Sequence, residues 1–99
     1  MNLDINTIKK LSTPIAEEYG VKKMSLFGSF SRNDFNENSD IDIHLIDYEG
    51  SWGLFKLLSF ESELENALGR YVDVITTDSF YDEILENVLR DEVIIYEAQ

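Results

Sequence analysis

The sequence has no cysteine and only one histidine, His44, among its 99 residues. Without thiols the chain can form neither disulfides nor thiolate metal sites, and a single imidazole excludes a multi-histidine zinc site. No apolar run approaches the roughly 20 residues of a membrane span, and residues 1–10 lack the apolar core of a signal peptide. We therefore expect a cytoplasmic protein without membrane segments, in which any bound metal has oxygen ligands.

Basic residues are also scarce, since 8 Lys and Arg stand against 20 Asp and Glu and the net charge is -12. Binding to a phosphate backbone normally depends on clustered Lys and Arg, so nucleic acid is disfavoured as a direct partner. The acidic surface either keeps the protein soluble or favours association with a basic protein.

Apolar residues are present in ordinary number, at 43% with 6 Phe, 5 Tyr and 1 Trp, which is typical of a globular protein rather than a disordered acidic chain. The length predicts a single domain over residues 1–99 with one modest core. It leaves no room for a second, substrate-binding domain, so a large substrate must be held partly by something else.

Apolar periodicity predicts an α+β fold, a small mixed β-sheet with helices packed on one face. Pro14 falls inside the first helical pattern, which is therefore either one kinked helix or two short ones. The expected helices cover residues 6–19, 54–68 and 79–89, and the expected strands cover 23–27, 40–46, 71–76 and 93–96.

Two acids, Asp40 and Asp42, lie two residues apart on an expected strand. Their side chains leave the same face, about 6–7 Å apart at the backbone, and carboxylates so close repel each other. The pair could be a solvated, acidic strand edge. It could also be a platform for a hard cation such as magnesium, which binds carboxylates together with substrate phosphates.

Three further residues favour the second interpretation. Gly28 and Ser29 directly follow the first strand, where a glycine lets the backbone approach a phosphate and the serine hydroxyl adds a donor. Asp73 stands on a later strand with its side chain opposite to the inward-facing Val72 and Val74, so it can join the pair. Two-metal phosphoryl-type transfer uses three such acids, and the third can also accept the proton of the attacking hydroxyl.

These residues resemble the signature of the DNA polymerase beta-like nucleotidyltransferase superfamily. The resemblance rests on GS at 28 and 29, Arg32, SDID at 39–42 and Asp73 within YVDVIT. The short chain, the residues before LFGS and the VIIYE ending are similar to the minimal nucleotidyltransferases. Ser31 and Asn33 depart from the usual Ala and Gly of the pattern, but neither is one of the three acids.

The resemblance implies a small mixed sheet backed by helices, with magnesium, in two ions, and ATP at the site. Asp40, Asp42 and Asp73 would be the catalytic, metal-binding acids, and Gly28 and Ser29 the phosphate loop. Arg32 and Ser39 are candidate nucleotide contacts, although Arg32 could instead tie its loop to nearby acids. His44 is expected to be partly exposed and hydrogen-bonded, outside the catalytic set.

Minimal members of this superfamily commonly act as antitoxins beside a HEPN-domain toxin. The resemblance therefore implies a hetero-oligomeric complex and the transfer of AMP from ATP to a tyrosine of the toxin. Two alternatives remain open at this point. The chain could neutralise its toxin by binding alone, without catalysis. It could also transfer the nucleotide to a small molecule, although the chain is short for holding one.

Overall fold

The computed structural model describes residues 3–32, 36 and 38–99. The elements follow one another as α1 (Ile5–Tyr19), β1 (Val21–Phe27), β2 (Ile41–Tyr48), α2 (Leu54–Leu68), β3 (Val72–Thr76), a 3-10 turn η1 (Thr77–Ser79), α3 (Asp82–Asp91) and β4 (Val93–Glu97). The strands form one sheet in the order β3-β2-β1-β4. Strands β2 and β3 are parallel and the other two pairs are antiparallel, which confirms the predicted α+β class with a mixed sheet.

Strand β2 shows the alternation that the sequence predicts. Ile41, Ile43 and Leu45 are fully buried, and Asp42 between them is only half-buried. Because successive side chains of a strand point to opposite faces, the isoleucines face the core and the aspartate faces the other side of the sheet.

Helix α1 is a single helix that contains Pro14, so of the two arrangements left open the chain does not form two short helices. It begins after Asp4, whose carboxylate accepts a hydrogen bond from the Thr7 N–H at 2.7 Å. It ends at Gly20, whose φ of 74° is the left-handed conformation favoured by glycine at this position.

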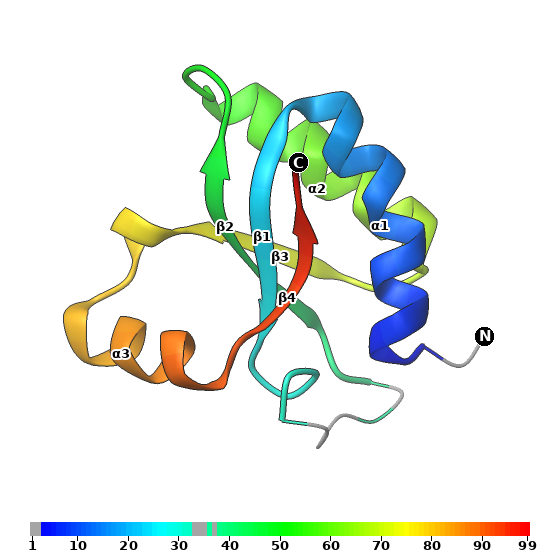
Figure 1. Cartoon of the computed structure of the whole chain (residues 1–99). Coiled ribbons are helices and arrows are strands. Elements are labelled where there is room, and N and C mark those ends of the chain that lie inside the picture. Colours follow the sequence, from blue (N-terminus) through cyan, green and yellow to red (C-terminus); the bar gives the residue numbers. More distant parts are fainter. Residues whose placement is uncertain (1–2, 33–35, 37) are drawn as a thin grey trace.

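The two long helices, α1 and α2, pack on each other and cover one face of the sheet, as predicted (Figure 1). Helix α3 lies on the opposite side, so the prediction of helices on one face is right for α1 and α2 and wrong for α3 (Figure 1). It begins later than expected, because residues 77–79 form η1 and Phe80 packs against the sheet instead of entering the helix. The Phe80 ring lies edge-on to Phe27 and His44, with centroids 5.3 and 5.2 Å away.

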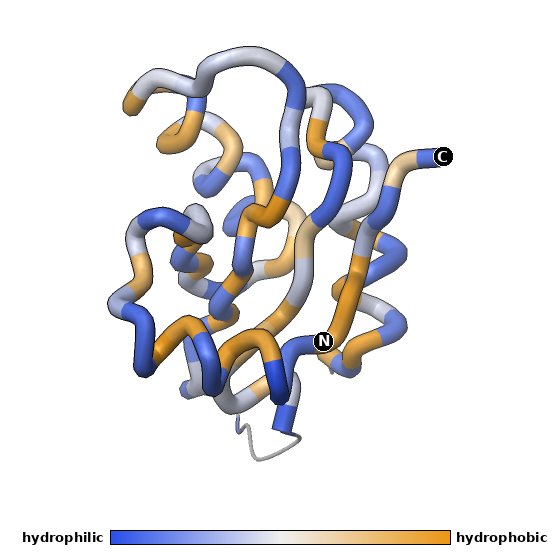
Figure 2. Tube along the Cα trace, turned by 60° about the vertical axis from the view of Figure 1, so that its left-hand side comes forward, coloured by the Kyte–Doolittle hydropathy of each residue, from blue (hydrophilic) through white to orange (hydrophobic). Residues whose placement is uncertain are grey.

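Helix α3 is amphipathic, and Figure 2 shows its apolar and hydrophilic residues in alternating bands. Only Val88 of this helix is buried, while Ile84 and Leu89 are 49% and 55% exposed. The helix therefore presents part of its apolar surface to the outside.

His44 is fully buried, so the expectation of a partly exposed side chain is wrong. Its Nδ1 lies 2.8 Å from a carboxylate oxygen of Glu92, and its Nε2 lies 2.6 Å from the Thr77 hydroxyl. The Ser25 hydroxyl donates to the same Glu92 oxygen at 2.6 Å. This network ties the centre of the sheet to the residues that flank α3.

Strand β3 is an edge of the sheet, and carboxylates of α2 lie against it. Glu65 accepts a hydrogen bond from the Val72 N–H at 3.2 Å. The pKa of Glu61 is raised overall. Burial and the charge of Asp73 raise it, and a hydrogen bond to the Val74 backbone lowers it. These two acids thus cover the outer side of the strand that carries Asp73.

No helix in the described ranges combines the length and apolarity that a bilayer crossing requires.

Candidate active site

Gly28, Asp42 and Asp73 lie side by side at the ends of three adjacent strands. Asp42 is opposite Phe27 in the antiparallel β1–β2 pair and opposite Asp73 in the parallel β2–β3 pair. Neighbouring strands are about 4.8 Å apart, so the two carboxylates project from adjacent positions on one face. The structure thus brings together Gly28 of the predicted phosphate loop and two of the three expected acids.

Gly28 touches Asp42 so closely that no side chain fits between them. Its φ is 72°, and a β-carbon at this position would lie 2.5 Å from Oδ2 of Asp42. Glycine is therefore favoured here by the backbone conformation, and a β-carbon would in addition displace the Asp42 carboxylate.

Asp42 is the electrostatic centre of the site. Burial and then the charges of Asp73 and Asp40 raise its pKa to about 6, against an opposing effect of Arg32. A carboxylate that is partly desolvated and faces two others is relieved by a cation. Carboxylate oxygens are ligands that hard cations such as magnesium or calcium prefer.

Asp40 is exposed and precedes the first residue of β2. Over the described residues, no group of three or more His, Cys, Asp or Glu side chains converges as a ready metal site. The three carboxylates Asp40, Asp42 and Asp73 are the type of ligand that a hard cation binds. In this structure, however, their oxygens do not converge on one point.

The loop after β1 forms a tight turn built on the Gly28 carbonyl, which accepts from the Arg32 N–H at 3.3 Å and the Ser31 hydroxyl at 2.9 Å. This explains Ser31, where the family pattern has alanine, since its hydroxyl stabilises the turn. Ser29 is half-buried within this turn, and Phe30 is fully buried and anchors it. Asn33 lies outside the described residues.

Arg32 and Ser39 differ in what surrounds them. The positive charge of Arg32 lowers the pKa of Asp42, as expected for an arginine close to the acids. Ser39 takes part in its own loop, where its hydroxyl accepts from the Asn36 N–H at 2.9 Å and its N–H donates to the Asn36 carbonyl at 3.1 Å. Both side chains stand at the edges of the site, and their contact with a nucleotide stays a prediction.

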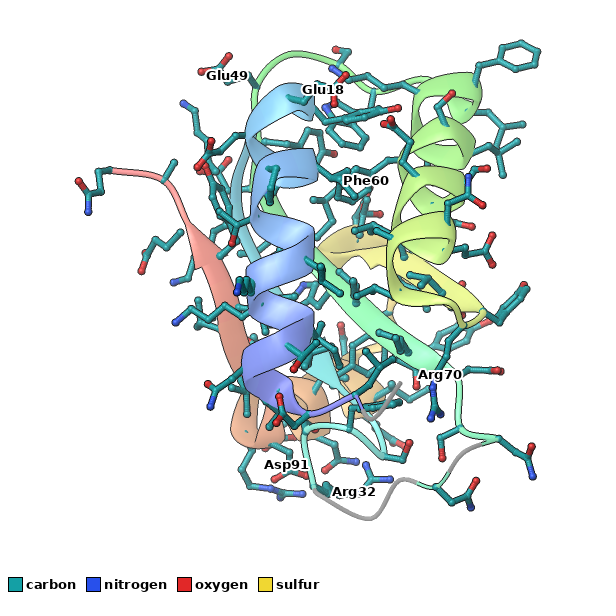
Figure 3. All side chains as sticks on the ribbon, turned by 90° about the vertical axis from the view of Figure 1, so that its right-hand side faces the viewer. Glu18, Arg32, Glu49, Phe60, Arg70 and Asp91 are labelled. Atoms are coloured by element: carbon teal, nitrogen blue, oxygen red, sulfur yellow. The ribbon has the colours of Figure 1, made fainter. Side chains whose placement is uncertain are left out.

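Arg70 is a residue of this region that the sequence does not single out. Its Nη1 donates to the carbonyls of Asn36 and Ser39 at 2.7 and 3.0 Å, and its guanidinium lies 5.5 Å from the centre of the Phe30 ring. Figure 3 places Arg70 at the same end of the molecule as Arg32. Only its position between Gly69 and β3 could have drawn attention to it.

A small cavity of about 260 Å³ opens beside Gly28, between the phosphate loop and α3. Its lining is mainly apolar, with Arg32, Asn87 and Asp91 as polar members. A mainly apolar cavity thus lies next to the carboxylates of the site.

The family model described as nucleotidyltransferase domain matches residues 8–96, nearly the whole chain, including every residue of the candidate site. The chain belongs to the nucleotidyltransferase domain family. It is an enzyme of the nucleotidyltransferase class by this membership, and the expectation drawn from the GS and Asp-x-Asp pattern is confirmed at the level of the family.

Two relatives show how far the similarity extends. A relative of this nucleotidyltransferase in Methanocaldococcus jannaschii, named for protein adenylyltransferase activity, is 40% identical over 91 residues, 92% of this chain and 97% of its own length. Protein adenylyltransferase MntA of Thermococcus cleftensis is 37% identical over 81 residues, 82% of this chain and 81% of its own.

Solved structures share the fold of this nucleotidyltransferase. A structure described as a minimal nucleotidyltransferase has a TM-score of 0.77 at 25% identity and covers 93% of this chain and 96% of its own. A toxin–antitoxin structure with AMP-PNP has a TM-score of 0.74 at 24% identity over 98% of this chain and 76% of that chain. A third, with a TM-score of 0.61 at 22% identity over 96% of this chain and 71% of that one, is a tri-AMPylated Shewanella oneidensis HEPN toxin in complex with its MNT antitoxin.

Proposed function

We propose that this nucleotidyltransferase is the antitoxin of a HEPN-domain toxin and transfers AMP from magnesium-bound ATP to a tyrosine hydroxyl of that toxin in the cytoplasm. The observation that carries the proposal is the Asp42 carboxylate, with its pKa raised to about 6, between Asp73 on one side and Gly28 on the other. The names of the relatives and the HEPN toxin complex among the structural neighbours support the choice of acceptor.

The phosphate loop would hold the terminal phosphates of ATP. Backbone N–H groups of the turn at Gly28 and the Ser29 hydroxyl are donors of the right kind, and the glycine lets the phosphates come close to the backbone. Arg32, whose charge already acts on Asp42, adds a positive charge at the same side.

Asp40, Asp42 and Asp73 would hold the magnesium ions, which when bound offset the phosphate charge and lower the pKa of the attacking hydroxyl. The acceptor oxygen forms a bond to the α-phosphorus while the bond to the bridging oxygen of the β-phosphate breaks and pyrophosphate leaves. Asp73, half-buried on the edge strand β3, would take the proton of the tyrosine.

The overall charge also supports a protein acceptor. A net charge of -12 repels free polynucleotides but favours docking on a ribonuclease, whose RNA-binding surface is basic.

The test is the intact mass of the toxin after incubation with the purified chain, ATP and magnesium. The mass should rise by one AMP group or by several, and tandem mass spectrometry should place them on tyrosine. Asp42→Asn and Asp73→Asn should leave the mass unchanged, whereas Asp47→Asn, an exposed acid farther along the same strand, should act like wild type.

Two results would overturn the proposal. If the toxin keeps its mass while the chain still blocks its ribonuclease activity, and the Asp42→Asn variant blocks it equally, the chain neutralises by binding alone. If only a small hydroxyl compound gains AMP, the acceptor class is wrong.

A further inference from the structure

We propose that Arg70 is a positioning residue, which ties the phosphate loop to the segment that carries the acid pair. The contacts of Arg70 stand independently of the reaction, while its effect on nucleotide binding rests on the proposed function. The role concerns a side chain that touches neither of the acids in the described structure and that no sequence pattern marks.

One side chain contacts both halves of the site. Arg70 Nη1 donates to the carbonyls of Asn36 and Ser39, and Ser39 directly precedes Asp40. The flat guanidinium lies over the Phe30 ring, at 5.5 Å from its centre, and Phe30 directly follows Ser29. Arg70 itself stands three residues before Asp73. It therefore links the segments next to the ends of β1, β2 and β3.

The contacts favour an arginine at this position. Its Nη1 donates to both carbonyls, its charge strengthens these two bonds, and the guanidinium also lies over the Phe30 ring. A lysine ammonium has three N–H donors and could bond to both carbonyls, but it has no planar group to lie over Phe30 at the same time.

The anchoring at the other end is firm because Phe30 is fully buried in the protein core. Ser39 and Asn36 also bond to each other, so the two residues whose carbonyls Arg70 binds are held together. Fixing Phe30 relative to Ser39 fixes Ser29 relative to Asp40, which is the separation that a magnesium-bound triphosphate has to bridge.

The first measurement is the affinity for a non-hydrolysable ATP analogue with magnesium, by titration calorimetry. Arg70→Gln should weaken binding about tenfold or more, the usual effect of removing a group that orients metal ligands. Arg70→Lys should recover only part of the loss, and added guanidinium ion should partly restore Arg70→Gln. Lys23→Gln removes the same charge from the Glu97 ion pair at the other end of β1 and should bind as wild type does.

The second measurement is backbone amide exchange by mass spectrometry. Arg70→Gln should speed exchange in the peptides that contain residues 28–32 and 38–42, and leave α1 and β4 unchanged. In the transfer assay the KM for magnesium ATP should rise more than kcat falls, because Arg70 positions the segments that bind the nucleotide.

Three outcomes would overturn the proposal: unchanged analogue affinity in Arg70→Gln, a lower melting temperature without local exchange, or full recovery by lysine. If wild type binds the analogue but modifies no toxin, the proposed function fails while the affinity and exchange measurements still decide the role of Arg70.

Discussion

Gly28 lies against Asp42, and a β-carbon on the glycine would stand 2.5 Å from the carboxylate oxygen Oδ2. The predicted phosphate loop and Asp42 therefore approach each other closely, at a separation that the absence of a side chain on Gly28 permits. A methyl group at position 28 therefore has to displace the Asp42 carboxylate or the loop.

Gly28→Ala should lose about 100-fold in transfer activity, because relief of the contact displaces either the loop or the acid by a fraction of an ångström to an ångström. Gly50→Ala is the matched control, since Gly50 has the same φ of 72° and no atom near its β-carbon. Both variants should lose about 1–2 kcal/mol of stability from the left-handed backbone. Equal activity of the two variants would show that the contact with Asp42 is unimportant.

Asp42→Asn should stabilise the protein at pH 7.5 in the presence of EDTA. The substitution removes the charge that burial and the neighbouring acids Asp73 and Asp40 disfavour. Because the group is only half-buried, we expect a gain of about 1 kcal/mol, a rise of roughly 4–8 °C in melting temperature. Asp47→Asn should give no rise, and a decrease in Asp42→Asn would contradict the assignment of Asp42 as a strained carboxylate.

The stability of the metal-free protein should depend on pH with a definite sign. Asp42 has an ordinary pKa of 3.8 and a pKa of about 6 in the folded protein. Between these values the folded state binds a proton that the unfolded state has released, so this contribution to stability decreases as pH rises from about 4 to about 6.

Urea unfolding between pH 3.5 and 8 measures this effect. Subtracting the curve of Asp42→Asn from that of wild type isolates Asp42 from the other acids. The difference should grow across the stated window and then level off. A difference that is constant with pH would mean that Asp42 has an ordinary pKa.

His44→Leu should destabilise the fold by about 2–3 kcal/mol, because it leaves the Glu92 carboxylate and the Thr77 hydroxyl without their buried partner. Glu92→Gln is the milder change, since its amide oxygen still accepts from the imidazole and from Ser25. Chemical denaturation of both variants gives the comparison. His44→Leu should lose more stability than Glu92→Gln. A greater loss for Glu92→Gln would contradict this interpretation of the network.

Much of the fold could be predicted because it depends on local patterns. The period-two alternation through Ile41, Asp42 and Ile43 decides which face of β2 carries the isoleucines of the core, and the bounds of α2 follow from its leucines and from Gly69. The juxtaposition of Asp42 and Asp73 needed only the correct pairing of two parallel strands.

The misjudged residues depend on distant contacts. His44 is buried because Glu92, 48 residues away, supplies a partner for its ring, and a single polar residue on a strand carries no mark of that partner. Arg70 bonds to backbone carbonyls, which every residue has, so its contacts leave no trace in residue types. Helix α3 starts late because Phe80 finds a better site against the sheet than in the first turn.

The Glu65 carboxylate accepts from the Val72 N–H on the outer edge of β3. An additional strand would need that donor, and it would meet the negative charges of Glu61 and Glu65 as it approached. The edge beside the acids is thus closed to sheet extension, which protects it from aggregation. A partner that presents a tyrosine to Asp73 must then dock through side chains, not by extending the sheet at β3, and strand-mimicking peptides should be poor inhibitors.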